Sequence, residues 1–218
     1  MGAGIPLSRL LGIPPPEREK QSSFNYDWAL LKAERSLASK LKPPLVPEAL
    51  AELDSLSEGE QVRRARVEDR YANPEFIYHL LEKGHDVRYR SSRRMLHLAR
   101  LAHLAAEACT IRAAGGERQL ADLRAWAWGQ YANALRISSQ PIEAGKAFSI
   151  ALHYRAQGTG DLKLHAWLLQ RTTALATLQN RFDDALKMCE KAGTIYQELG
   201  ESHLFASTSV QLAIATLY

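Results

Sequence analysis

Two stretches of this chain share one pattern: residues 125–151 read AWAWGQYANALRISSQPIEAGKAFSIA, and residues 166–192 read AWLLQRTTALATLQNRFDDALKMCEKA. Corresponding positions lie 41 residues apart, and the clearest are Ala125 and Ala166, Trp126 and Trp167, Ala144 and Ala185, Phe148 and Cys189, and Ala151 and Ala192. A fixed period of this size predicts stacked helical hairpins, because one hairpin cannot bury its apolar face alone.

Small residues recur where the two helices of each hairpin are expected to cross. They are Ala132 and Ala144 in the first hairpin and Thr173 and Ala185 in the second. A larger side chain at these positions would push the helices apart. The sequence as a whole is rich in Ala and Leu and lacks runs of β-branched residues, which predicts an all-α fold.

The segments before the repeats predict further helices. Residues 1–22 are expected to form a flexible N-terminal segment, and residues 23–114 an N-terminal helical region that includes a helix over 24–41. Ser57 and Glu60 have the spacing of a capping box that would open a helix to about Arg70. Within this region, further helices are predicted over 73–84, where Asn73-Pro74 is a typical start, and over 92–114. Residues 115–218 then hold the repeats, with the last unit incomplete.

The repeat pattern resembles the tetratricopeptide repeat, in a variant whose period exceeds the family's ~34 residues. This resemblance implies a right-handed α-solenoid of antiparallel hairpins, whose leading helices line a concave groove for a peptide or a partner helix. The groove-facing candidates that it implies are Trp126, Asn133, Arg136, Trp167, Gln170 and Arg171. Gly129 stands where family members that clamp a terminal carboxylate carry lysine, which speaks against such a clamp.

Two alternatives stay open for these residues. Trp126 and Trp167 could instead be packing residues between neighbouring hairpins, since large aromatic residues serve cores and interfaces alike. Arg63, Arg66 and Arg70 step by three and four positions, so they could form a basic stripe that contacts phosphates. A solvated basic face is the reading that the sequence favours, with a nucleic-acid-associated regulator as the alternative function.

Other chemistry has little support in the sequence. No Cys-x-x-Cys or His-Glu-x-x-His spacing occurs among the two cysteines and seven histidines, so we expect no metal site. Cys109 and Cys189 lie at helical spacing among apolar residues, which predicts two buried free thiols. No nucleophile with its base is evident, so we expect neither catalysis nor a cofactor.

The expected function is therefore that of a non-catalytic, cytoplasmic scaffold or adaptor that binds a protein or peptide. No run of apolar residues is long enough to cross a membrane. The final helix ends on apolar residues without a polar capping helix, whereas repeat arrays normally carry such a cap. This end is thus expected to meet a second copy of the chain or to continue into a longer array.

Overall fold

The computed structural model of the chain describes residues 45–216, and that range is all-helical, without a β-strand. The predicted flexible segment over 1–22 and the predicted helix over 24–41 lie outside the described residues. The helices are, in order, α3 (Leu45–Asp54), α4 (Glu58–Val67), α5 (Pro74–Val87), α6 (Ser92–Ala108), α7 (Ile111–Ala114), α8 (Glu117–Ile137), α9 (Pro141–Gln157), α10 (Leu162–Leu178), α11 (Phe182–Glu198) and α12 (Ser202–Thr216).

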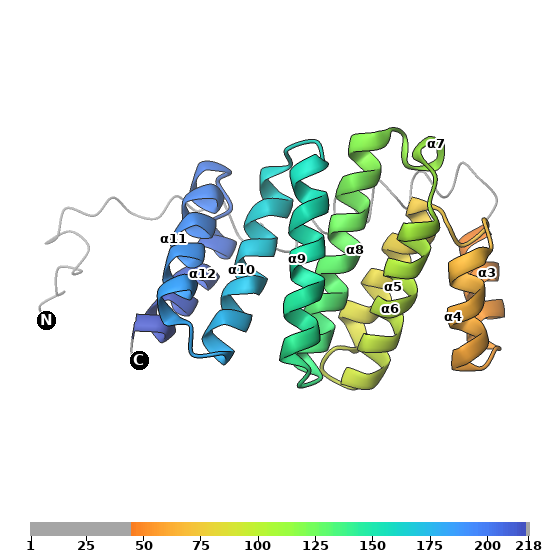
Figure 1. Cartoon of the computed structure of the whole chain (residues 1–218), viewed down its shortest axis with the longest axis horizontal. Coiled ribbons are helices and arrows are strands. Elements are labelled where there is room, and N and C mark those ends of the chain that lie inside the picture. Colours follow the sequence, from red (N-terminus) through yellow and green to blue (C-terminus); the bar gives the residue numbers. More distant parts are fainter. Residues whose placement is uncertain (1–44, 217–218) are drawn as a thin grey trace, which may run out of the picture.

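The helices stand side by side in a row, from α3 and α4 at one end to α11 and α12 at the other (Figure 1). Helices α5, α8, α10 and α12 contact one another in turn, and we call them the leading layer. Helix α6 packs on α5 and α8, α9 on α8 and α10, and α11 on α10 and α12. Each leading helix is thereby held both by its layer neighbours and by helices adjacent in the sequence.

The pairs α8–α9 and α10–α11 share an offset of 41 residues at three of their four helix ends, whereas α8 and α10 begin 45 residues apart. Their first helices end at Ile137 and Leu178, and their second helices end at Gln157 and Glu198. The turns between them also match, because the middle residue of each has a left-handed backbone, with φ 59° at Ser139 and φ 57° at Asn180. In both turns the next amide closes the helix end, from Gln140 N to Leu135 O at 3.0 Å and from Arg181 N to Ala176 O at 2.9 Å. At these two turns, the 41-residue offset of the sequence therefore coincides with the same backbone conformation and the same hydrogen bond.

The apolar core forms successive clusters between neighbouring helices. The largest joins α3 to α8 and contains Phe76, Ile77 and Leu80 together with residues of α6. Further clusters lie between α8, α9 and α10 and between α10, α11 and α12. The four small residues predicted at the helix crossings are all buried, and both cysteines are buried free thiols, as expected.

The predicted start of α5 is confirmed, and α10 begins with a similar side-chain cap. Asn73 accepts a hydrogen bond from Phe76 N at 2.9 Å, and Pro74 takes the first position of α5. Asp161 caps α10 by accepting from Lys163 N and Leu164 N. Polar side chains at these positions satisfy amides that have no partner within the helix.

Three helix boundaries differ from the predictions. The first is the end of α4, which lies at Val67 rather than at about Arg70. The segment over 92–114 is two helices, because Thr110 caps α7 and interrupts the chain after α6. Helix α5 does not break near Gly84, where a Cβ would lie 3.6 Å from Leu98 Cβ, so this glycine sits at the contact with α6.

The capping box at the start of α4 is only half formed. Ser57 accepts from Glu60 N at 3.4 Å. The Glu60 carboxylate instead binds the guanidinium groups of Arg63 and Arg64. Ion pairing on the helix surface has thus replaced the reciprocal half of the box, because an oppositely charged side chain one turn away is a closer partner.

Helices α8 and α10 approach each other closely at Gly129. A Cβ built on this residue would lie 2.6 Å from Leu168 Cδ2 and 2.7 Å from Trp167 Cζ3, which is inside van der Waals contact. The absent side chain therefore makes room for two large residues of the neighbouring leading helix. This gives a structural reason for glycine in the middle of a helix, where it otherwise costs up to ~1 kcal/mol.

We expect Gly129→Ala to lower the free energy of unfolding by about 1–3 kcal/mol, because the new methyl group overpacks the α8–α10 contact. Gly145→Ala is the matched control: it also lies within a helix, but its nearest contact would be Leu175 Cδ2 at 3.9 Å. This control should be neutral or stabilising by up to ~1 kcal/mol. Urea unfolding of both variants measures the difference, and equal midpoints would contradict the close approach.

His103 of α6 lies between two aromatic rings of α8. Its ring centroid is 4.4 Å from that of Trp128 and 4.3 Å from that of Tyr131. The side chain is 7% exposed, and its Nδ1 is buried without a hydrogen-bond partner. Burial lowers the pKa of His103 to about 4, and the positive charges of Arg100 and Arg66 act in the same direction.

The fold should therefore lose stability as the pH falls from about 6.5 to about 4. Over this range His103 binds a proton in the unfolded chain but stays neutral when it is buried in the folded chain. For this residue the loss amounts to about 3 kcal/mol, and it is complete below the folded-state pKa. We expect His103→Phe to lose correspondingly less stability over this interval in urea titrations. His153→Phe, at an exposed histidine of α9, should keep the full loss. The same loss in His103→Phe would show that the buried ring is not responsible.

Candidate partner-binding site

All six residues that the sequence proposed as partner contacts lie on α8 and α10. The two tryptophans touch each other: the ring centroids of Trp126 and Trp167 are 4.3 Å apart, with the rings at 61°. Both rings are half-buried. They join the two leading helices, as the packing alternative expected, while part of each ring stays accessible.

Asn133 and Gln170 are buried, at 6% and 4% exposure. Asn133 Oδ1 accepts a hydrogen bond from Arg136 Nη2 at 2.9 Å. Gln170 Nε2 donates to Ser207 Oγ on α12 at 3.3 Å. These two amides therefore hold neighbouring side chains and helices in place, and neither offers a free surface to a partner.

Arg136 and Arg171 are half-buried and lie within electrostatic range of each other. Burial lowers the pKa of Arg136. Burial also lowers the pKa of Arg171, and the charges of Arg136 and Arg88 lower it further. The Arg171 guanidinium carbon lies 5.7 Å from the ring centroid of Trp167, and its Nε is buried without a hydrogen-bond partner. Two buried positive charges thus stand close together in the leading layer.

Arg88 joins this pair from α5, and the sequence had not placed it in the site. It caps the C-terminal end of α5, where its Nη1 donates to His85 O at 2.8 Å. Its guanidinium carbon lies 4.2 Å from the ring centroid of Tyr89, which is 86% exposed. Arg88 precedes the 41-residue period, so no repeat position pointed to it. Helix α5 packs on α8, which also packs on α10, and the charge of Arg88 acts on Arg171.

Within residues 45–216, none of Arg88, Arg136 and Arg171 forms an ion pair with a carboxylate. A further unmatched group lies beside them, because the hydroxyl of Tyr196 on α11 is buried without a hydrogen-bond partner. Burial raises the pKa of Tyr196, whereas the charge of Arg171 on the neighbouring helix α10 acts to lower it. We call Arg88, Arg136 and Arg171 the arginine triad.

The arginines proposed as phosphate contacts are arranged differently. Arg63 binds Glu60 at 2.6 Å, and Arg70 binds Glu52 at 2.5 Å. Glu60 is held ionised, because its hydrogen bonds to Arg63 and Arg64 lower its pKa to about 2. Arg66 is exposed and makes no ion pair in the described part of the chain. Most of the charge of this stripe is therefore neutralised by neighbouring carboxylates.

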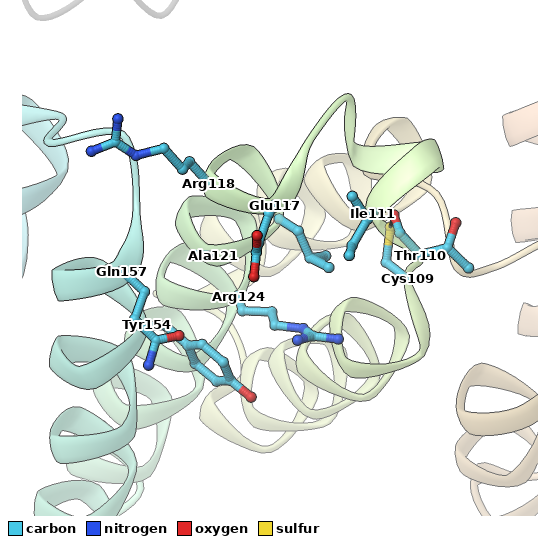
Figure 2. A pocket seen from close by; sticks show the side chains of 10 residues that line it. Cys109, Thr110, Ile111, Glu117, Arg118, Ala121, Arg124, Tyr154 and Gln157 are labelled. Carbon is cyan, nitrogen blue, oxygen red and sulfur yellow. Dashed lines mark hydrogen bonds between the residues drawn. The ribbon is translucent and has the colours of Figure 1, made fainter.

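A pocket of about 520 Å³ lies where α6, α7, α8 and the end of α9 meet. Figure 2 shows Tyr154 and Gln157 on one side of it and Cys109 and Ile111 on the other, with Arg124 between them.

Arg124 and Tyr154, two polar side chains that line this pocket, already have partners. Arg124 donates to Ala106 O at 3.2 Å and to Glu107 O at 2.9 Å, and so closes the C-terminal end of α6. Tyr154 donates its hydroxyl to Glu107 Oε2 at 3.0 Å. Burial raises the pKa of the Cys109 thiol, which disfavours a reactive thiolate. The pocket groups thus hold helices together.

Two further searches cover the described residues only. They contain no group of three or more His, Cys, Asp or Glu side chains that could hold a metal ion. They also contain no helix that is long and apolar enough to cross a bilayer. The arginine triad is therefore the arrangement whose charges most need a partner.

We expect Arg171→Met to raise the free energy of unfolding by about 1–2 kcal/mol, because it replaces a buried, unpaired charge with an apolar chain of similar length. Arg94→Met is the matched control: Arg94 is also half-buried, but it binds Asp54 at 2.5 Å. This control should be neutral or destabilising, since it leaves Asp54 with one partner fewer. Urea unfolding at neutral pH checks both, and a destabilised Arg171→Met would show that this charge is compensated in the fold.

The comparisons with known proteins assign nothing to this arrangement. No protein-family model matches the chain, and no curated protein and no solved structure matches it either. What the site can do must be argued from its own residues.

Proposed function

We propose that this protein is a non-catalytic scaffold or adaptor that binds a protein partner on its leading layer. We further propose that the leading layer is the concave side of a right-handed α-solenoid of antiparallel hairpins, similar to a long-period tetratricopeptide array. The matched turns at Ser139 and Asn180 support a true repeat, because the same backbone conformation recurs at the same offset as the sequence pattern. Arrays of this kind present extended surfaces for recognition.

The arginine triad is the observation that carries this proposal. Three guanidinium groups from α5, α8 and α10 have no carboxylate partner within residues 45–216, and half-buried charges without such a partner cost stability. Charged groups kept at such a cost are typical of binding sites. Tyr89, exposed beside Arg88, adds an aromatic residue of the kind that dominates interface energetics.

A cytoplasmic location is part of the proposal, and the two buried free thiols support it. The alternative of a nucleic-acid-associated regulator has weaker support. Arg63 and Arg70, which would contact phosphates, are already bound to Glu60 and Glu52. A duplex would have to displace these carboxylates before it could use either charge.

The test places a photo-crosslinking amino acid at single serines. Ser207 lies on α12 beside Gln170 of the leading layer, whereas Ser149 lies on the exposed face of α9. We expect one and the same protein to be crosslinked in cells from Ser207 and not from Ser149, with mass spectrometry identifying it. Crosslinks from Ser149 alone, or none from either position, would contradict binding on the leading layer.

A further inference from the structure

We propose that the arginine triad is a preformed anion-binding site that receives an acidic side chain of the partner protein. This inference rests on the proposed function, because the partner supplies the carboxylate. It goes further because it names the group that the partner must carry, a carboxylate, and the three arginine side chains that bind it.

The first step is the arrangement of charge. Arg88 and Arg136 lie at the C-terminal ends of α5 and α8, and Arg171 lies on α10 within range of both charges. Each arginine comes from a different helix, so the site exists only in the folded array. Like charges gathered in this way repel one another, and a bound anion would turn that repulsion into attraction.

The second step is the set of unused hydrogen-bond donors. Arg171 Nε is buried without a partner, and so is the hydroxyl of Tyr196 beside it. A buried donor that lacks a partner costs about 1–3 kcal/mol. An oxyanion at the triad would accept from the guanidinium of half-buried Arg171, for which the described chain supplies no acceptor.

The third step is the choice between anions. The triad residues are half-buried between helices, in contrast to Arg63 and Arg93, whose side chains are 67% and 84% exposed. A single carboxylate on a flexible side chain can approach the accessible part of such half-buried side chains and meet guanidinium groups in the bidentate geometry that they favour. The phosphates of a stiff duplex bind more readily to exposed basic side chains on the protein surface. The site therefore favours an acidic peptide segment.

Nearby side chains keep the triad in position. Asn133 accepts from Arg136 through both Nε and Nη2, at 3.3 and 2.9 Å, and thereby orients its guanidinium. The ring of Trp167 lies under Arg171, and that of Tyr89 lies under Arg88. Because these contacts hold the arginines in place before binding, less conformational entropy is lost when the anion arrives.

The experiment measures binding of a fluorescent hexaglutamate peptide to the full-length protein by anisotropy at low salt, with hexaglutamine as the neutral probe. We expect Arg136→Gln and Arg171→Gln each to weaken hexaglutamate binding about tenfold, as for loss of one charge-assisted contact. Arg93→Gln is the matched control, because it removes the same charge from an exposed position on α6, and it should change binding less than about twofold. Circular dichroism verifies that each variant is folded.

Three outcomes would overturn the site: equal losses in Arg93→Gln and Arg171→Gln, equal binding of hexaglutamine, or tighter binding of a duplex that also depends on Arg171. Inorganic phosphate serves as a competitor, and displacement of hexaglutamate at a lower concentration than glutamate requires would reassign the site to phosphate. If Ser207 crosslinks a partner while the triad variants bind hexaglutamate as tightly as the unchanged protein does, this inference fails and the scaffold function stands. Triad-dependent binding without any crosslinked partner supports the site and contradicts the scaffold function.

Discussion

The arrangement of the leading layer depends on the close approach of α8 and α10 at Gly129. Because this position has no side chain, Trp167 and Leu168 lie directly against α8, and Trp167 also meets Trp126. Arg136 follows Gly129 by seven positions and Arg171 follows Trp167 by four, so each arginine shares a helix face with the contact residue before it. The contact that joins the helices therefore also brings two charges of the triad together.

The arginines of the described chain fall into two groups, those with a carboxylate partner and those without one. Around α3 and α4, Arg64 and Arg70 share Glu52, and Arg94 shares Asp54 with Lys83. In the leading layer, by contrast, three arginines remain without a carboxylate in the described chain. A sequence selected for stability alone would have paired or removed such charges, since buried unpaired charge is among the most costly features of a fold. That local cost is the physical argument for function at the triad.

The sequence predicted the fold where local chemistry alone determines it. The all-α fold, the Asn73 cap and the burial of Cys189 all follow from spacing and side-chain type. The breaks did not, because Gly84 belongs to a contact with α6 and Thr110 interrupts a run of good helix formers. Packing of α5 on α6 decides the first case, and the local cap formed by the Thr110 side chain decides the second.

The candidate site was predictable only in part, because α8 is surrounded by other helices on several sides. A one-faced periodicity assigns residues to a buried or an exposed side, yet α8 is contacted by α5, α6, α9 and α10. Asn133 is consequently buried, although its position had suggested a groove contact. Arg136, three positions later in the last turn of α8, retains accessible surface where the helix ends. Arg88, in turn, caps the C-terminal end of α5. If the proposed function holds, recognition by this layer is concentrated around a few arginine and tyrosine side chains rather than spread along a groove, and their charge selects the partner.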